Sequence, residues 1–122
     1  NKALRNSAFV DDAANTAVDL KHGSFSITQA GWSNYPSGIP RPNGPFRIIQ
    51  GEEYEIARKA ADKANAALHK ANPEKYAGKQ IHEIHPVKFG GSPTDLSNKI
   101  ALTPSEHYAY NTFWRRMQSS IR

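Results

Sequence analysis

The sequence contains no cysteine among its 122 residues, which excludes disulfide bonds and thiolate metal ligands. Any metal ion would therefore be held by histidine, asparagine, aspartate or glutamate side chains. No apolar run approaches the roughly 18 residues that a membrane-spanning helix needs, so we expect no transmembrane segment. An initiator methionine and a basic-then-apolar signal segment are also missing, and we expect the chain to be a piece of a longer protein.

Acidic residues are outnumbered by basic ones. Eleven Asp and Glu stand against sixteen Lys and Arg, which gives a net charge of +5 when histidine is neutral. This balance favours a polyanionic ligand such as nucleic acid, or an acidic protein partner. The length predicts one domain over residues 1–122, which we expect to be monomeric.

The first 50 residues differ in composition from the rest of the chain. Residues 1–22 carry Ala and Val at loosely helical spacing, which predicts a short helix. Residues 23–50 hold four of the eight prolines and four of the eight glycines, together with several aromatic and Ile side chains. Because a disordered linker would have fewer apolar groups, this mixture predicts an ordered loop with two short strands that wraps the core.

The clearest helical pattern lies in residues 51–72. Alanine recurs at i, i+3, i+4 and i+7 from Ala57 to Ala71, and Pro73 ends the helix. Its buried face is mostly alanine and should pack closely against a neighbour. The opposite face carries four basic residues that we interpret as a solvated surface: Arg58, Lys59, Lys63 and Lys70.

Residues 78–122 predict two strands followed by a helix, so the chain as a whole belongs to the α+β class. The first strand is expected at 80–85, where Pro86 ends it, and the second at 99–102. A loop that contains two adjacent glycines joins them.

The final helix has a strong start signal. Thr103 is placed as the N-cap, Pro104 occupies the first helical position, and Glu106 completes a capping box. Apolar residues then repeat at i, i+4, i+7 and i+11, which predicts the core-facing side of the helix. These residues are Tyr110, Trp114, Met117 and Ile121.

Histidine and asparagine fall at particular places in this ββα order, in IHEIHPVKFGG and in TDLSNKIALTPSEHYAYN. His82 stands four residues before a proline, and Asn98 follows Glu83 by fifteen. His107 then follows Asn98 by nine, and Asn111 follows His107 by four. These segments resemble the His-Asn-His (HNH) endonucleases, which have a ββα-metal core. The resemblance is particularly to colicin-type DNases and to the C-terminal nuclease toxin domains of Rhs-type bacterial polymorphic toxins.

The resemblance implies a role for each of these positions. His82, His107 and Asn111 match the metal ligands of the family, and Asn98 matches the asparagine that braces the loop between the strands through backbone hydrogen bonds. Glu83 stands where the family has its general-base histidine. The ion implied is a single divalent cation, and two imidazoles with an amide or carboxylate suit Zn²⁺, Ni²⁺ or Mn²⁺ and tolerate Mg²⁺.

Three assignments of the general base are compatible with the sequence. Glu83 could be the base, His85 could be the base, or a shift of one residue could make His82 the base and Glu83 a metal ligand. In an extended strand Glu83 and His85 share one face, while His82 and Ile84 share the other. We therefore take Glu83 and His85, with Asn98, as the catalytic candidates.

The reaction implied by the resemblance is metal-assisted hydrolysis of a phosphodiester bond in DNA, with little dependence on base sequence. Lys88, Lys99, Arg115 and the adjacent Arg116 surround the motif and are candidate phosphate contacts. A ribonuclease on the same scaffold is one alternative. A non-catalytic basic domain that binds nucleic acid or an acidic partner is another.

The resemblance to polymorphic toxins also implies a delivery route and a partner. The domain would be secreted or delivered as part of a larger toxin and would act in the cytoplasm of the target cell. The producing cell would then need an immunity protein, and the net charge of +5 suits an acidic one.

Overall fold

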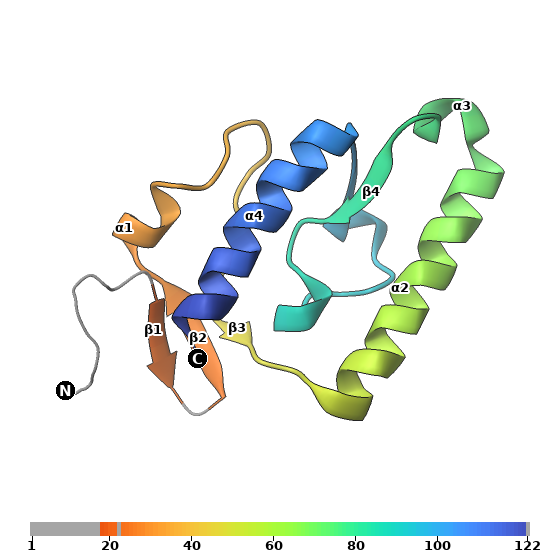
Figure 1. The fold of residues 1–122 in the computed structure, drawn as a ribbon. Helices are drawn as coiled ribbons and strands as arrows, with labels where there is room; N and C mark the ends of the chain where they lie inside the picture. Colours follow the sequence, from red (N-terminus) through yellow and green to blue (C-terminus); the bar gives the residue numbers. More distant parts are fainter. Residues whose placement is uncertain (1–17, 22, 122) are drawn as a thin grey trace.

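A computed structural model describes residues 18–121 with the exception of residue 22 (Figure 1). Short strands and helices are mixed along this range, which confirms the α+β class. The elements are β1 (Val18–Lys21), β2 (Ser24–Ile27), α1 (Gln29–Trp32), β3 (Phe46–Arg47), α2 (Gly51–Ala71), α3 (Pro73–Tyr76), β4 (Gln80–Glu83), η1 (Val87–Phe89), η2 (Leu96–Asn98), β5 (Lys99–Leu102) and α4 (Pro104–Ser120).

The strands form two separate antiparallel sheets. β1, β2 and β3 make one sheet in that order, and β4 pairs with β5 in the other. A short helix was expected in residues 1–22. Most of these residues lie outside the described part of the chain. The last part, 18–21, is β1 and not a helix, because its backbone pairs with β2.

The segment between β1 and α2 supplies aromatic side chains to the main hydrophobic core. Phe25 and Phe46 stack with ring centroids 5.3 Å apart, and both are 1% exposed. Trp32 stacks on Phe113 of α4 at 5.6 Å. Burial of each such ring stabilises the fold by roughly 1.5–3 kcal/mol. The Pro- and Gly-rich segment is therefore ordered and packs on the core, as its apolar content predicted.

Helix α4 begins where the capping signal placed it. The Thr103 hydroxyl accepts a hydrogen bond from the Glu106 backbone N–H (3.2 Å), and the Glu106 carboxylate accepts one from the Thr103 N–H (2.8 Å). The predicted apolar side of the helix is also confirmed, since Tyr110, Trp114 and Met117 are buried. This packing fixes the rotation of α4 and so decides which residues face β4.

Strand β4 ends at Glu83, two residues earlier than expected. It pairs with β5 in a register that sets Glu83 opposite Lys99. Beyond Glu83 the Ile84 N–H still donates to the Asn98 backbone carbonyl (2.8 Å), but the next backbone N–H, that of His85, donates to the Asn98 side-chain oxygen (2.8 Å). The chain after β4 is therefore no longer extended, and side-chain alternation along a strand does not carry over to His85.

Helix α2 packs less closely than its alanine pattern predicted. Ala61 is its only buried residue, and Ala57, Ala60 and Ala64 remain partly exposed. Figure 1 shows β4 between α2 and α4, so α2 forms the outer wall of the ββα unit. Its attachment depends on the polar side chains described below. Among the described residues, no helix is both long and apolar enough to span a membrane.

Candidate functional site

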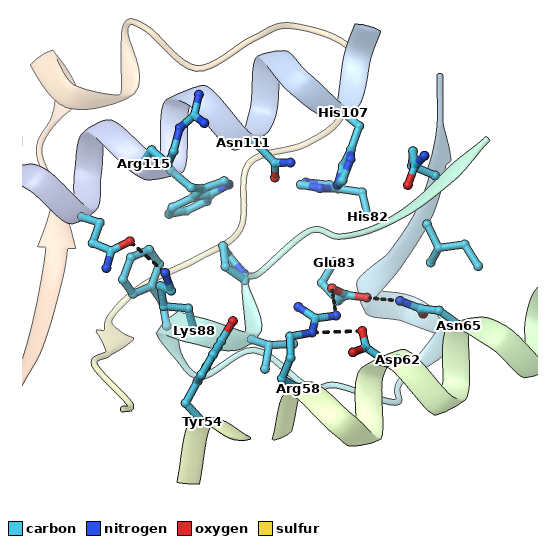
Figure 2. A pocket seen from close by; sticks show the side chains of 17 residues that line it. Tyr54, Arg58, Asp62, Asn65, His82, Glu83, Lys88, His107, Asn111 and Arg115 are labelled. Atoms are coloured by element: carbon cyan, nitrogen blue, oxygen red, sulfur yellow. Dashed lines mark hydrogen bonds and ion pairs between the residues drawn. The ribbon is translucent and has the colours of Figure 1, made fainter. Parts of the chain in front are cut away.

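A cavity of about 500 Å³ lies between α2 and α4, with β4 and η1 between the two helices (Figure 2). Helix α2 contributes Tyr54, Arg58, Asp62 and Asn65 to its lining. β4 and η1 contribute His82, Glu83 and Lys88, and α4 contributes His107, Asn111, Trp114, Arg115 and Gln118. The cavity therefore gathers side chains that are up to 64 positions apart in the sequence, from 54 to 118.

His82 and His107 lie together on the α4 side of the cavity. Their ring centroids are 5.4 Å apart, and His82 is only 4% exposed. Burial, assisted by the nearby His107, lowers the pKa of His82 to about 4. Burial also lowers the pKa of His107. Both imidazoles are therefore neutral at pH 7, which is the form that can offer a lone pair to a metal ion.

The Nε2 atom of His82 is buried and has no hydrogen-bond partner. Leaving such an atom unsatisfied costs about 1–3 kcal/mol, so unpaired buried nitrogens are uncommon in folded proteins. Only three buried side-chain polar atoms in the described part of the chain are unpaired, and two of them belong to residues that line this cavity, His82 and Trp114. The cavity therefore has unused bonding capacity on its α4 side.

Asn111 completes this group, one turn beyond His107 on α4. Figure 2 shows the Asn111 amide on the same side of the cavity as the two imidazoles. Nowhere in the described residues do three or more His, Asp or Glu side chains gather to hold a metal. A metal site here would therefore consist of two imidazoles and one amide oxygen, with water completing the coordination shell.

Glu83 points toward α2 and is bound by three side chains. Asn65 donates to its Oε2 (2.9 Å), Lys99 donates to the same oxygen (3.1 Å), and Arg58 donates to Oε1 (3.3 Å). Burial opposes ionisation of this carboxyl, but the hydrogen bonds from Asn65 and Lys99 outweigh it and lower the pKa of Glu83. A carboxylate offers about four acceptor positions, so one remains, on Oε1.

The residues of α2 in this network were not predicted as functional from the sequence. Arg58, interpreted as part of a solvated face, also donates through Nε to Asp62 (3.1 Å) and lines the cavity. One signal could have found it. Tyr54, Arg58, Asp62 and Asn65 fall at i, i+4, i+8 and i+11, which places them on one side of the helix.

The structure does not bring His85 into the cavity. Its Nε2 lies 2.9 Å from the Phe89 carbonyl oxygen, and its ring packs 4.8 Å from Phe46. The neighbouring loop is very tight, because a Cβ at Gly91 would lie 1.8 Å from the His85 carbonyl oxygen. His85 therefore has the contacts of a structural histidine.

Asn98 also lies outside the cavity lining, and its side chain ties the loop together. The amide nitrogen donates to the carbonyls of His85 (3.0 Å) and Ser92 (2.9 Å), and the amide oxygen accepts from the His85 N–H (2.8 Å). These are backbone hydrogen bonds of the kind that the HNH resemblance implies for this position. Asn98 therefore holds the loop that follows β4.

The candidate phosphate contacts divide into two kinds. Lys88 and Arg115 line the cavity. Lys99 does not, because its side chain is 2% exposed and its ammonium is bound to Glu83 and Asn65. Arg116 is exposed and is not part of the lining. The Arg115 guanidinium, however, donates to the Thr112 hydroxyl (3.1 Å) and lies 5.8 Å from the centroid of the Tyr108 ring, and both of these residues are outside the lining. Lys88 is therefore better placed than Arg115 to meet an anion in the cavity.

Comparison with known proteins adds no relative, since no protein-family model, no curated protein and no solved structure matches this chain.

Proposed function

We propose that this domain is a metal-dependent endonuclease that hydrolyses phosphodiester bonds in DNA with a ββα core of the HNH class. The observation that carries the proposal is the unpaired, buried Nε2 of His82, held beside His107 on a cavity that also presents cationic side chains. The order β4, β5, α4 supports it, as does the position of Asn98 between the two histidines.

His82, His107 and Asn111 would hold the divalent ion. Their donor set fits, because both imidazoles are neutral and the amide oxygen is a suitable third ligand. When bound, the ion would supply Lewis-acid charge to the phosphate oxygens. The same ion would also bind the buried Nε2 of His82, which would explain why that atom has no hydrogen-bond partner in the protein.

Glu83 would take the proton of the attacking water. A general base must be ionised and must face the reacting group. The three donors keep Glu83 ionised, one acceptor position remains on its Oε1, and Glu83 is among the residues that line the cavity. His85 is a poorer candidate because its ring lies outside the cavity lining.

Lys88 and Arg115 would bind the backbone of the substrate. Contacts of this kind position a strand without reading its bases, so we propose a nuclease with little sequence preference. A cavity formed by one helix on each side of β4 presents no element suited to enter a major groove.

The direct test is incubation of the purified protein with supercoiled plasmid and with total RNA. EDTA is present in one arm, and Mg²⁺, Mn²⁺, Ni²⁺ or Zn²⁺ is added in the others. We expect metal-dependent cutting of the plasmid, and a loss of at least about a hundredfold in the His107→Ala variant. His69→Ala is the matched control, because His69 is exposed on α2 and outside the cavity lining.

The same assay decides between the proposal and its competitors. Cutting of RNA alone would make the domain a ribonuclease. Absence of cutting with every metal would leave a basic binding domain, an outcome that one observation favours, since Glu83 at the base position is already bound by three donors. Delivery by a larger toxin and neutralisation by an acidic immunity protein are part of the proposal and rest on the sequence resemblance.

A further inference from the structure

We infer that the cavity contains a second anion subsite, formed by Lys88 and Gln118, that binds another phosphate of the same strand. The inference rests on the proposed function and deepens it, because it makes the substrate a polynucleotide strand and not an isolated phosphodiester. The subsite lies at the end of the cavity away from His82 and His107.

The length of the cavity along α4 requires two points of contact. Gln118 follows His107 by eleven residues, and a helix rises 1.5 Å per residue, which separates them by about 16 Å. A nucleic acid strand carries one phosphate per about 3.4 Å of duplex axis. One phosphate cannot reach both ends, whereas a short stretch of strand can. The volume of about 500 Å³ likewise exceeds the space that one phosphate fills.

Two contacts fix the position of the Lys88 ammonium at this end of the cavity. Its Nζ donates to the Gln118 side-chain oxygen (2.9 Å) and lies 5.8 Å from the centroid of the Tyr54 ring. These contacts come from α4 and α2, so they fix the ammonium between the two walls. An ammonium has three N–H donors, and Gln118 uses one. Two donors therefore remain for an incoming anion.

The charge at this end is uncompensated. The carboxylates of the cavity lining, Asp62 and Glu83, are both paired with Arg58, and Glu83 is also paired with Lys99. In the described part of the chain Lys88 has no carboxylate partner. Positive potential is therefore concentrated at the end of the cavity that the histidine pair leaves unused.

The experiment compares a dinucleotide, which has one phosphodiester, with a hexanucleotide. In the Lys88→Ala variant we expect kcat/KM to fall about tenfold more on the hexanucleotide than on the dinucleotide, because only the longer strand reaches the subsite. Lys59→Ala is the matched control, since Lys59 is an exposed lysine of α2 outside the lining. Equal losses on both substrates, or no loss on either, would overturn the inference.

Two further measurements separate this inference from the proposed function. Binding of a fluorescent hexanucleotide in EDTA needs no catalysis, and Lys88→Ala should reduce the slope of log affinity against log salt by about 0.7, the value for one phosphate contact on a single strand. Gln118→Glu, which retains the hydrogen bond but neutralises Lys88, should act in the same way and guards against a folding defect. If the wild-type protein cuts nothing but Lys88→Ala still reduces the slope, the proposed nuclease activity is wrong and the subsite is retained. An unchanged slope would remove the subsite.

Discussion

The two helical walls of the cavity differ in whether their buried polar groups have hydrogen-bond partners. On the α2 side, Glu83 is bound by three donors, and Arg58 is held by two carboxylates. On the α4 side, His82 and Trp114 each keep a buried nitrogen without a partner. A saturated buried network specifies structure, whereas unsatisfied buried groups are costly and call for an explanation, such as a ligand. We therefore propose that the α2 wall stabilises the fold and that the α4 wall binds the ligand.

The largest effect should come from breaking the α2 wall at Glu83. Glu83→Ala leaves the Lys99 ammonium buried without its carboxylate, and loss of one partner of a buried pair costs about 3–5 kcal/mol. Urea denaturation would measure this as a lower midpoint at unchanged slope. Glu53→Ala is the control, because its pair with Arg47 is more than half exposed and its loss should leave the urea midpoint nearly unchanged. Equal costs for the two variants would contradict a stabilising α2 wall.

The second-largest effect should be the change in the free energy of unfolding with pH. Burial lowers the pKa of His82 to about 4, whereas an unfolded histidine titrates near about 6.5. Between these values the unfolded chain binds the additional proton, so the free energy of unfolding falls as pH falls from about 6.5 to about 4, by about 3 kcal/mol. His107 adds to this loss with the same sign, and the lowered pKa of Glu83 places its own loss at more acidic pH.

The variant that isolates this effect is His82→Leu, measured with wild type in EDTA. Leucine has a similar volume and no buried nitrogen, so the variant should be at least as stable as wild type at pH 7 and should lose part of the slope between pH 6.5 and 4. Identical pH profiles for the two proteins would mean that His82 is not buried in its neutral form.

Metal binding should stabilise the α4 wall by a similar or smaller amount. A ligand at a hundred times its Kd raises the free energy of unfolding by about 2.7 kcal/mol. Thermal unfolding with added Zn²⁺ or Mn²⁺ should therefore show a higher Tm for wild type and for His69→Ala, and no increase for His107→Ala. A rise in Tm that survives His107→Ala would place the ion elsewhere.

Local signals explain the parts that the sequence could predict. The capping box at Thr103 and Glu106 fixed the start of α4, and its apolar spacing fixed the rotation that turns His107 and Asn111 toward β4. The resemblance to the HNH endonucleases predicted that His82 and His107 belong to one site, and their ring centroids lie 5.4 Å apart. These relations lie within one short ββα unit, where few other arrangements are compatible with the chain connectivity.

Long-range relations explain the parts that could not be predicted. Arg58 in α2 and Glu83 in β4 are 25 residues apart in the sequence, and their spacing does not predict the contact between them. Lys99 was expected to face a phosphate, but the strand register sets it directly opposite Glu83, where it is buried. Glu83 and His85 were expected to face the same site, but the chain bends after Glu83, where the His85 N–H donates to the Asn98 side chain, and the His85 ring packs on Phe46 outside the cavity lining.

The smallest expected effect sharpens the comparison within the α2 wall itself. Arg58 is held by Glu83, whose side chain is 8% exposed, and by Asp62, whose side chain is 69% exposed. If the buried partner alone determines the position of Arg58, Asp62→Asn should cost no more than about 0.5 kcal/mol in urea denaturation, as for other exposed i,i+4 pairs. The change also removes one negative charge from the cavity lining, so hexanucleotide affinity in EDTA should rise slightly. A stability cost near that of Glu83→Ala would show that the exposed carboxylate contributes as much to the wall as the buried one.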